Sequence, residues 1–336
     1  LASCIRCRSP VESVEAAQAV AESVGYPVLL KASAGGGGRG IRRVYGPEEL
    51  PEAFESARAE AVACFGNGEM YLEKLILRPR HIEVQILADR HGHVISLGDR
   101  DCSVQRRNQK LLEEAPAWGL SAELRKEMGQ AAVRAAKAVG YENAGTVEFL
   151  LDPDGQHFYF MEMNTRIQVE HGITELVTGV DLVREQLRIA SGLPLSVTQE
   201  EVRITGHAME CRVNAEDPAA DFRPCPGTVE FLHFPGGPGV RGDSCLYTGC
   251  QMPPWYDSLA AKLMAYAPTR LEAIRKLRRC LEEFILEGFP TNAELTYQIL
   301  YHPEFIRGCC TTAFLEEHLP ELLEFRRRLE EREAAV

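Results

Sequence analysis

Residues 31–40 read K-A-S-A-G-G-G-G-R-G, between an apolar run at 26–31 and a second short run, I-R-R-V, at 41–44. Both runs predict strands, so the unit is strand, glycine loop, strand. Gly35, Gly37 and Gly40 formally satisfy G-x-G-x-x-G, but that dinucleotide fingerprint needs a helix directly after its last glycine. No Lys-Ser or Lys-Thr ends the loop, which also excludes a P-loop. The segment therefore predicts neither of the two common nucleotide-binding turns.

Four consecutive glycines allow successive backbone N–H groups to point at one anion, and allow the loop to close over it as a lid. Lys31, at the end of the preceding strand, adds a point charge suited to a phosphate. A flexible surface hairpin is the alternative interpretation. Ordering four glycines costs much conformational entropy, which favours the phosphate lid.

The flanking sequence alternates between helical and extended patterns. Helices are expected at 12–24, 48–65, 124–140, 181–191 and 271–281. A half-buried strand at 82–88 pairs with 93–97 across the turn 89–92, and strands 147–151 and 157–164 are joined by D-P-D-G. Beyond about residue 202, short strands alternate with Gly/Pro loops, and a charged helical tail begins at Glu321. We predict an α+β fold with a domain boundary near residue 200.

Composition excludes several classes of protein. The sequence has 49 Asp plus Glu and 37 Lys plus Arg, which gives a net charge of -12. This negative charge argues against nucleic acid or an anionic membrane as a partner. No apolar run is long enough to span a bilayer, and the first residues do not form a signal peptide. The 11 cysteines lack the short spacings of a disulfide scaffold, so we expect a reducing cytoplasmic or mitochondrial matrix location.

Acidic residues on two neighbouring strands form a candidate metal site. Glu162 and Asn164 share one face of their strand, and the D-P-D-G hairpin places Glu148 opposite or diagonal to Glu162. Like charges in that position are destabilising unless something neutralises them. Two carboxylates and an amide oxygen suit Mg²⁺. The alternative is a solvated sheet face, but the flanking residues are strongly apolar, so we favour the metal.

The next residues run T-R-I-Q-V-E-H, which spaces Arg166, Gln168 and Glu170 two apart. On a strand, this row would present a planar cation, an amide and a carboxylate along one edge. Arginine binds planar oxyanions through two parallel hydrogen bonds, and the carboxylate could accept a proton. A solvated edge strand would show the same alternation, so both interpretations stand.

Five motifs occur in order along the chain: the glycine loop, Glu73-Lys74, R-D-C-S-V-Q-R-R-N-Q-K at 100–110, E-M-N-T-R-I-Q-V-E-H at 162–171 and H-A-M-E-C-R-V-N-A-E-D-P at 207–218. Together they resemble biotin carboxylase, an ATP-grasp enzyme. The resemblance covers about residues 20–320. It implies an ATP-grasp small subdomain with the glycine lid at 1–80 and a large subdomain with the metal and bicarbonate site at 81–201. A biotin carboxylase C-terminal domain at 202–325 and a charged tail at 326–336 would complete the chain.

The resemblance also implies roles for individual residues. ATP would be held by Lys31, Gly35, Gly36, Gly37, Gly38, Glu73, Lys74, His81, Gln105 and Asn108. Mg²⁺ or Mn²⁺ would bind Glu148, Glu162 and Asn164. Bicarbonate would lie against Lys110, Arg166, Gln168 and the backbone of Val169, with Glu170 as its general base and Arg212 stabilising the biotin enolate.

The implied reaction is the ATP-dependent carboxylation of biotin on a carrier protein. Bicarbonate attacks the γ-phosphate to give carboxyphosphate, which yields CO₂ and phosphate, and the phosphate deprotonates biotin. No A-M-K-M biotin-attachment sequence occurs, so the carrier would be another domain or chain. The resemblance also implies a carboxyltransferase and a second copy of this chain as partners. The complex would be an acetyl-CoA, propionyl-CoA or pyruvate carboxylase, and it could serve fatty acid biosynthesis.

Three departures from the family pattern are visible. Asn108 stands where some members carry His, and Gly172 replaces the usual Pro after Glu170-His171. The family's first domain is also expected to be missing from this sequence. Two rival functions therefore stay open: another ATP-grasp ligase such as a carbamoyl phosphate synthase domain, or an inactive nucleotide-binding fragment with an assembly role.

Overall fold

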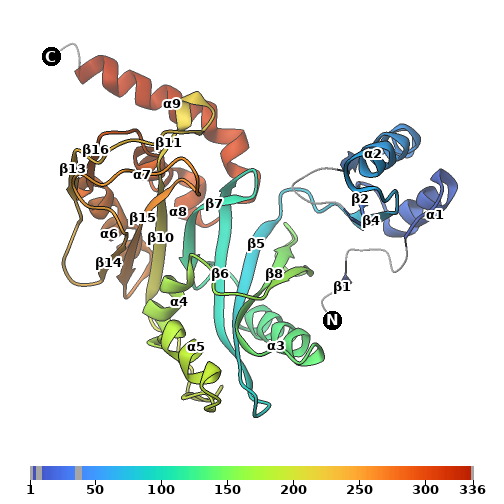
Figure 1. The fold of residues 1–336 in the computed structure, drawn as a ribbon, viewed down its shortest axis with the longest axis horizontal. Helices are drawn as coiled ribbons and strands as arrows, with labels where there is room; N and C mark the ends of the chain where they lie inside the picture. Colours follow the sequence, from blue (N-terminus) through green and yellow to red (C-terminus); the bar gives the residue numbers. More distant parts are fainter. Residues whose placement is uncertain (1–2, 5–9, 35–39, 334–336) are drawn as a thin grey trace. The chain divides into compact units, whose positions relative to one another are not determined.

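The computed structural model describes residues 3–4, 10–34 and 40–333. It divides into two compact units, one of residues 1–77 with 152–161, the other of residues 78–151 with 162–336. Helices and strands are interleaved in both (Figure 1), which confirms the predicted α+β class. No helix among the described residues combines the length and apolar character needed to cross a membrane.

The first unit packs two helices against a small antiparallel sheet of order β3-β2-β4. Ser13 caps the first helix by accepting the Ala16 N–H at 3.2 Å, and Gly25 ends it with a φ of 79°. A short parallel pairing joins β1 to β9. The elements are β1 (Ser3–Cys4), α1 (Val14–Val24), β2 (Val28–Ala32), β3 (Ile41–Val44), α2 (Leu50–Phe65), β4 (Met70–Lys74) and β9 (Phe158–Asn164), which runs on into the second unit.

The two strands predicted on either side of the glycine loop are present and pair with each other in antiparallel fashion. Lys31 on β2 pairs with Ile41 on β3, and Val28 pairs with Val44. Residues 35–39, and with them the predicted phosphate contacts of Gly35 to Gly38, lie outside the described residues. Gly40 has a φ of +69°, and a Cβ added there would lie 2.8 Å from Ala32 Cβ, so this position requires glycine.

The second unit is organised around antiparallel strands in the order β8-β5-β6-β7-β10-β15-β14 (Figure 1). Helix α3 packs on β5, β6 and β8, whereas α4 packs on β6, β7, β10 and β15. The strands are β5 (Arg80–Ala88), β6 (Val94–Arg106), β7 (Gln109–Ala115), β8 (Asn143–Leu151), β10 (His207–Asn214), β14 (Val240–Asp243) and β15 (Leu259–Ala267). The two helices are α3 (Ala122–Ala138) and α4 (His171–Thr178).

The carboxyl-terminal part of this unit buries an apolar core between β10, β15 and several helices. Thr269 and Glu272 form a reciprocal capping box that starts α6. The remaining elements are α5 (Leu182–Ala190), β11 (Glu216–Asp217), the 3₁₀ turn η1 (Pro218–Ala220), β12 (Arg223–Pro224), β13 (Phe231–His233), α6 (Arg270–Glu283), β16 (Ile285–Glu287), α7 (Ala293–Ile299), α8 (Pro303–Arg307) and α9 (Phe314–Glu333). The predicted helical tail is thus the later part of α9.

The compact units divide near residue 78, close to the predicted boundary at 80/81. The predicted boundary at 201/202 falls inside the second unit, because β10 pairs with β7 and joins the residues on either side into one sheet. The four domain ranges stay predictions, since a compact unit and a family domain are different divisions of a chain.

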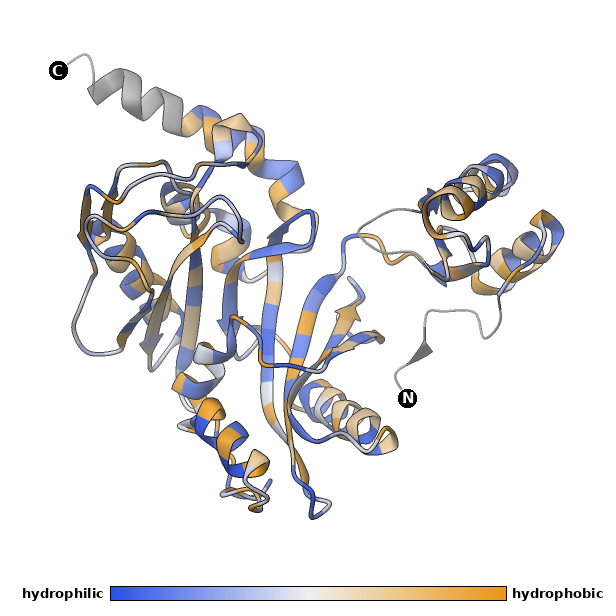
Figure 2. Ribbon diagram, viewed as in Figure 1, coloured by the Kyte–Doolittle hydropathy of each residue, from blue (hydrophilic) through white to orange (hydrophobic). Residues whose placement is uncertain are grey.

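The prediction that the strand at 82–88 is half-buried is wrong. Hydrophilic and hydrophobic residues do alternate along β5 (Figure 2), but both faces are covered. Glu83 and Gln85 are completely buried, and His81 is 6% exposed. A polar row inside a domain must find partners, because an unpaired buried charge is costly. This row is where the candidate site begins.

Candidate active site

The polar face of β5 lies between charged residues on both neighbouring strands. Glu83 pairs in register with Arg100 on β6 and with Glu148 on β8. The three side chains are buried, Arg100 completely so. Cross-strand neighbours in register are about 5 Å apart at Cβ, so the sheet itself brings two carboxylates and a guanidinium together.

Arg100 is the structural centre of this group. Its guanidinium donates to Glu83 Oε1, to Gln85 Oε1 at 2.8 Å and to Thr174 Oγ1 of α4 at 2.8 Å. It also donates to Gln168 Oε1 at 3.0 Å and, more weakly, to Thr146. Arginine's rigid fork suits such a role. Arg100 therefore fixes the segment that carries Gln168 onto the sheet.

Lys110 on β7 contacts three carboxylates at once. Its Nζ lies 2.6 Å from Glu83 Oε2, 3.0 Å from Glu148 Oε1 and 2.7 Å from Glu170 Oε1. Burial opposes its charge, but Glu83 and the other carboxylates raise the pKa of Lys110 well above its usual value. Burial likewise opposes ionisation of Glu83, yet Arg100 and Lys110 lower the pKa of that carboxyl to about 2. The site holds fixed, mutually stabilised charges.

Arg212 on β10 approaches the same carboxylate from the other side. Its Nη2 donates to Glu170 Oε2 at 2.9 Å, and its Nε donates to Glu113 Oε1 at 2.6 Å. Glu170 is 1% exposed and directly precedes α4. Two cations, Lys110 and Arg212, thus hold its two oxygens in one orientation.

Glu148 is held by three neighbours. His81 Nε2 lies 3.1 Å from Glu148 Oε2, and Lys110 and Gln168 both contact Oε1, the latter at 2.8 Å. Burial would raise the pKa of Glu148, but His81 and then Lys110 lower it overall. A buried, ionised carboxylate is a suitable ligand for a hard divalent cation. The other two predicted metal ligands lie at the end of β9, where Glu162 is exposed and Asn164 is half-buried.

The predicted row of Arg166, Gln168 and Glu170 along one strand edge is wrong. The strand ends at Asn164, and the chain turns into α4. Gln168 and Glu170 are buried in the site, whereas Arg166 is exposed and donates to the Ile167 carbonyl at 3.3 Å. Alternation in a turn does not place side chains on one edge, because the period-2 rule holds only for extended backbone.

The remaining predicted residues of the second unit lie around this centre. Lys262 donates to the Val169 carbonyl at 2.7 Å and so anchors the backbone expected to bind bicarbonate. Gln105 is buried on β6, next to the β6–β7 turn. Asn108 is exposed in that turn with a φ of +69°, a conformation that Asn tolerates well.

In the first unit, Lys31 and Glu73 form an ion pair of 2.5 Å across the β2–β4 pairing. Lys74 donates to the carbonyls of Gly25 and Tyr26 at 2.7 and 2.9 Å. The predicted nucleotide roles of these three residues stay predictions.

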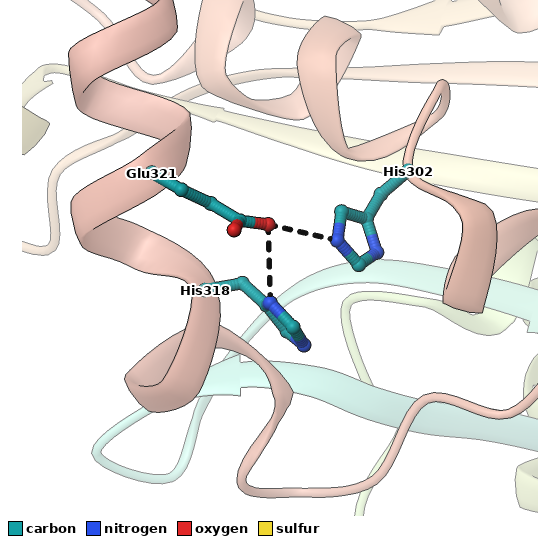
Figure 3. Close-up of side chains that lie close together, drawn as sticks. All are labelled: His302, His318 and Glu321. Carbon is teal, nitrogen blue, oxygen red and sulfur yellow. Dashed lines mark hydrogen bonds and ion pairs between the residues drawn. The ribbon is translucent and has the colours of Figure 1, made fainter.

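A separate cluster of metal-type ligands joins α8 to α9 (Figure 3). Glu321 Oε1 lies 3.0 Å from His302 Nε2 and 3.1 Å from His318 Nδ1. His302 Nδ1 accepts the Glu304 N–H at 3.3 Å, so in the neutral ring the proton is on Nε2 and points at Glu321. A metal needs a lone pair at that nitrogen. The cluster is therefore a structural cap and hydrogen-bonded contact.

Sequence reasoning missed five charged residues of the buried network. Their common property is a place on a middle strand, facing an opposite or like charge across the sheet; they are Glu83, Arg100, Glu113, Glu210 and Lys262. For Glu83, Arg100 and Glu113 the signal in the sequence was the mixture of acidic and basic residues within 80–115, but the strand register is needed to show that they are neighbours; Glu210 and Lys262 lie outside that range.

Two family models match the chain. "Carbamoyl-phosphate synthase L chain, ATP binding domain" covers residues 3–198, and "Biotin carboxylase C-terminal domain" covers residues 210–317. The second excludes the rival carbamoyl phosphate synthase assignment. The chain belongs to the biotin carboxylase family. Members are ATP-dependent ligases, and the fold is an ATP-grasp fold followed by this C-terminal domain.

Similar proteins of this family are known from several organisms. The chain is 56% identical over 307 residues to a biotin carboxylase from Nostoc sp. and 52% identical over 308 residues to biotin carboxylase 1 of Bacillus subtilis. Those matches cover 91% and 92% of this chain and 68% of each relative.

A solved structure also matches. It is the biotin carboxylase domain dimer of Hydrogenobacter thermophilus 2-oxoglutarate carboxylase in complex with MgADP, ADP and bicarbonate. It has a TM-score of 0.87 and 48% identity over 96% of this chain and 71% of that one. The chain thus spans about two thirds of these proteins.

Proposed function

We propose that this chain carboxylates biotin with bicarbonate in a reaction that consumes ATP and requires Mg²⁺. The observation that carries the proposal is the buried trio of Lys110, Glu170 and Arg212, with Glu170 between two cations. This arrangement can accept a proton from an anionic substrate and neutralise the charge that develops on it.

In the proposed first step, Glu170 accepts the proton of bicarbonate. The freed oxygen attacks the γ-phosphorus of ATP, the bond to the β-phosphate bridging oxygen breaks, and carboxyphosphate and ADP form. Lys110 and Gln168, with Arg166 reaching from the surface, would hold the planar anion. Phosphoryl transfer depends mainly on positioning and electrostatics, which the fixed charge network supplies.

In the proposed second step, carboxyphosphate separates into CO₂ and phosphate. The phosphate removes the proton of the biotin ureido nitrogen, and that nitrogen attacks CO₂. Arg212 would stabilise the negative charge on the ureido oxygen. Its contact with Glu170, the proposed base for bicarbonate, supports this role.

The donor set fits a magnesium ion. Glu148 offers a buried ionised carboxylate, and Glu162 and Asn164 add a second carboxylate and an amide oxygen, all hard oxygen donors. When bound, Mg²⁺ would neutralise charge on the nucleotide phosphates. Lys31, Glu73, Lys74, His81, Gln105, Asn108 and the loop of Gly35 to Gly38 are the proposed nucleotide contacts.

The proposed partners follow from the chemistry and from relatives. The acceptor is biotin on a carrier protein, a carboxyltransferase uses the product, and two copies of the chain form a dimer, as in the domain dimer from H. thermophilus. The buried cysteines Cys102, Cys211 and Cys280 are free thiols, which supports the expected cytoplasmic location.

The test is bicarbonate-dependent ATP hydrolysis, measured with and without free biotin. Wild type should hydrolyse ATP only with bicarbonate and faster with biotin. Glu170→Gln should lose both rates, while Glu142→Gln, an exposed residue paired with Arg90, should keep them. Normal ATP binding with no response to bicarbonate would support the inactive-fragment alternative instead.

A further inference from the structure

Two carboxyl groups face each other beneath α4, and the steps above use neither. Glu113 on β7 and Glu210 on β10 are directly paired in register. Both are completely buried. Side chains paired in this way are about 5 Å apart at Cβ, so the two carboxyls are immediate neighbours in a site without water contact.

Their oxygens are incompletely hydrogen-bonded. Glu113 Oε1 accepts from Arg212 Nε at 2.6 Å. Glu113 Oε2 and both oxygens of Glu210 have no hydrogen-bond partner. Two buried carboxylates with three such oxygens would be strongly destabilising if both were ionised. A proton on one of them supplies the missing donor and removes one of the two charges.

The surrounding cations are committed elsewhere. Lys262 on β15 donates to the Val169 carbonyl and pairs with Asp243 at 3.3 Å. Arg212 binds Glu113 and Glu170, and Lys110 binds Glu83, Glu148 and also Glu170. Helix α4 carries two titratable residues: His171 contacts the Gln168 carbonyl, and Glu175 pairs with Arg241. Helices α6 and α7 pack on the opposite face of β10, which carries Met209, Cys211 and Val213. None of these contacts satisfies Glu210.

We propose that Glu113 and Glu210 share one proton and together position Arg212. Glu210 carries the proton and donates it to Glu113 Oε2, while Glu113 stays a carboxylate that holds Arg212 Nε. Arg212 in turn keeps its Nη2 on Glu170. The pair acts through Arg212 and does not touch substrate. Its consequence for catalysis rests on the proposed function, but the presence of the proton does not.

The electrostatic environment agrees with a shared proton. Burial and then Glu113 raise the pKa of Glu210 well above its usual value. Burial also raises the pKa of Glu113 to about 7, against the lowering by Arg212. The pair therefore retains a proton at neutral pH and releases it as the pH rises. The second negative charge would then draw Arg212 toward the pair and away from Glu170.

Infrared spectroscopy of the full chain without substrates tests the proton directly. At pH 7, wild type should show the carbonyl stretch of a protonated carboxyl, and Glu210→Gln should lack that band. Glu216→Gln is the matched control, because Glu216 is also buried, with one oxygen accepting from Ser258, but pairs in register with Pro224 and not with a second carboxyl; it should keep the band. No band in wild type, or a band that persists in Glu210→Gln, would overturn the proposal whether or not the enzyme carboxylates biotin.

The positioning role is tested by the pH profile of the biotin-dependent rate. Glu210→Gln keeps a donor and cannot ionise, so its kcat at pH 7 should be within about threefold of wild type. The alkaline pH at which the biotin-dependent rate of this variant declines should be higher than in wild type, or the decline should be absent. Glu210→Leu leaves Glu113 Oε2 unpaired and should lower kcat about tenfold with an unchanged KM for ATP. An equal loss of kcat in both variants would contradict the positioning role. So would a decline of the Glu210→Gln rate at the same alkaline pH as in wild type.

Discussion

Arg100, Lys110 and Arg212 supply the positive charge of the buried site, and each does so differently. Arg100 is completely buried, and its guanidinium donates hydrogen bonds to side chains of the protein. Lys110 is a point charge among three carboxylates, and Arg212 links Glu170 to the Glu113–Glu210 pair. The side chains of Lys110 and Arg212 are 10% and 15% exposed, whereas that of Arg100 has no exposure, so we assign Arg100 a structural role and the other two a chemical one.

Arg212→Ala should separate the two proposed half-reactions. Bicarbonate-dependent ATP hydrolysis should be largely kept, while carboxylation of biotin should fall by about 10² or more, because one stabilising contact to developing charge is lost. The measurement compares ADP release with carboxybiotin formation under the same conditions. An equal loss of both would contradict the role assigned to Arg212.

Arg100→Met should destabilise the fold itself. The change leaves Glu83 buried with one of its two cations removed, and breaking such a pair costs about 3–5 kcal/mol. Chemical denaturation measures the loss in free energy of unfolding. The control is Arg90→Met, an exposed pair with Glu142, where the change should be at most about 1 kcal/mol. Similar losses in the two variants would show that the buried network is not stabilising.

At the scale of elements, the start of α4 brings the site together. Glu170 immediately precedes this helix, Thr174 on it binds Arg100, and its apolar side packs on Met264. Gly172 fits closely there: a Cβ would lie 2.5 Å from Met264 Sδ. The glycine therefore allows the helix to approach β15 and keeps Glu170 between its two cations.

Gly172→Ala should destabilise the protein by about 1 kcal/mol, and part of that loss should disappear in a Met264→Ala background. A double-mutant cycle in free energy of unfolding measures this coupling, expected at 0.5 kcal/mol or more. Gly129→Ala in α3 is the control: its Cβ would meet Ser96 Oγ at an ordinary 3.4 Å, so it should be neutral or stabilising. Additive effects would show that the Gly172–Met264 contact does not matter.

The sequence predicted most elements because their signals are local, as with Ser13 and Gly25 around α1. It failed where tertiary context decides. The polar residues of β5 alternate like a solvated face, yet Arg100 and Lys110 from β6 and β7 contact them and they are buried. Arg166, Gln168 and Glu170 keep a period of two through a turn. Lys110, Glu170 and Arg212 were identified through family resemblance, whereas Arg100 and Glu210 were missed because neither spacing nor motif shows their partners.

At the scale of the whole molecule, the net charge of -12 conceals an interior in which acids and bases are paired. The surface repels polyanions, while the buried cations Lys110 and Arg212 can attract a small one. Because these acids are paired with cations in the folded chain, the free energy of unfolding depends on pH. Glu83 has a pKa of about 2 in the folded chain, lowered from 4.5, against the opposing effect of burial.

A lowered folded pKa means that Glu83 contributes stability above pH 4.5, and that this stability is lost as the pH falls toward 2. We expect wild type to lose on the order of 3 kcal/mol in this window from Glu83. Glu83→Gln should be less stable at pH 7 but lose less on acidification. Denaturation at several pH values measures both, and parallel curves for the two proteins would contradict the prediction.

The proposed activity of the whole chain is the joining of bicarbonate to biotin with hydrolysis of ATP. Its most direct test is the transfer of isotopically labelled bicarbonate to free biotin, followed as acid-labile carboxybiotin. We expect incorporation that requires ATP and Mg²⁺, disappears in Glu170→Gln and persists in Glu142→Gln. ATP hydrolysis stimulated by bicarbonate with no label in biotin would contradict it.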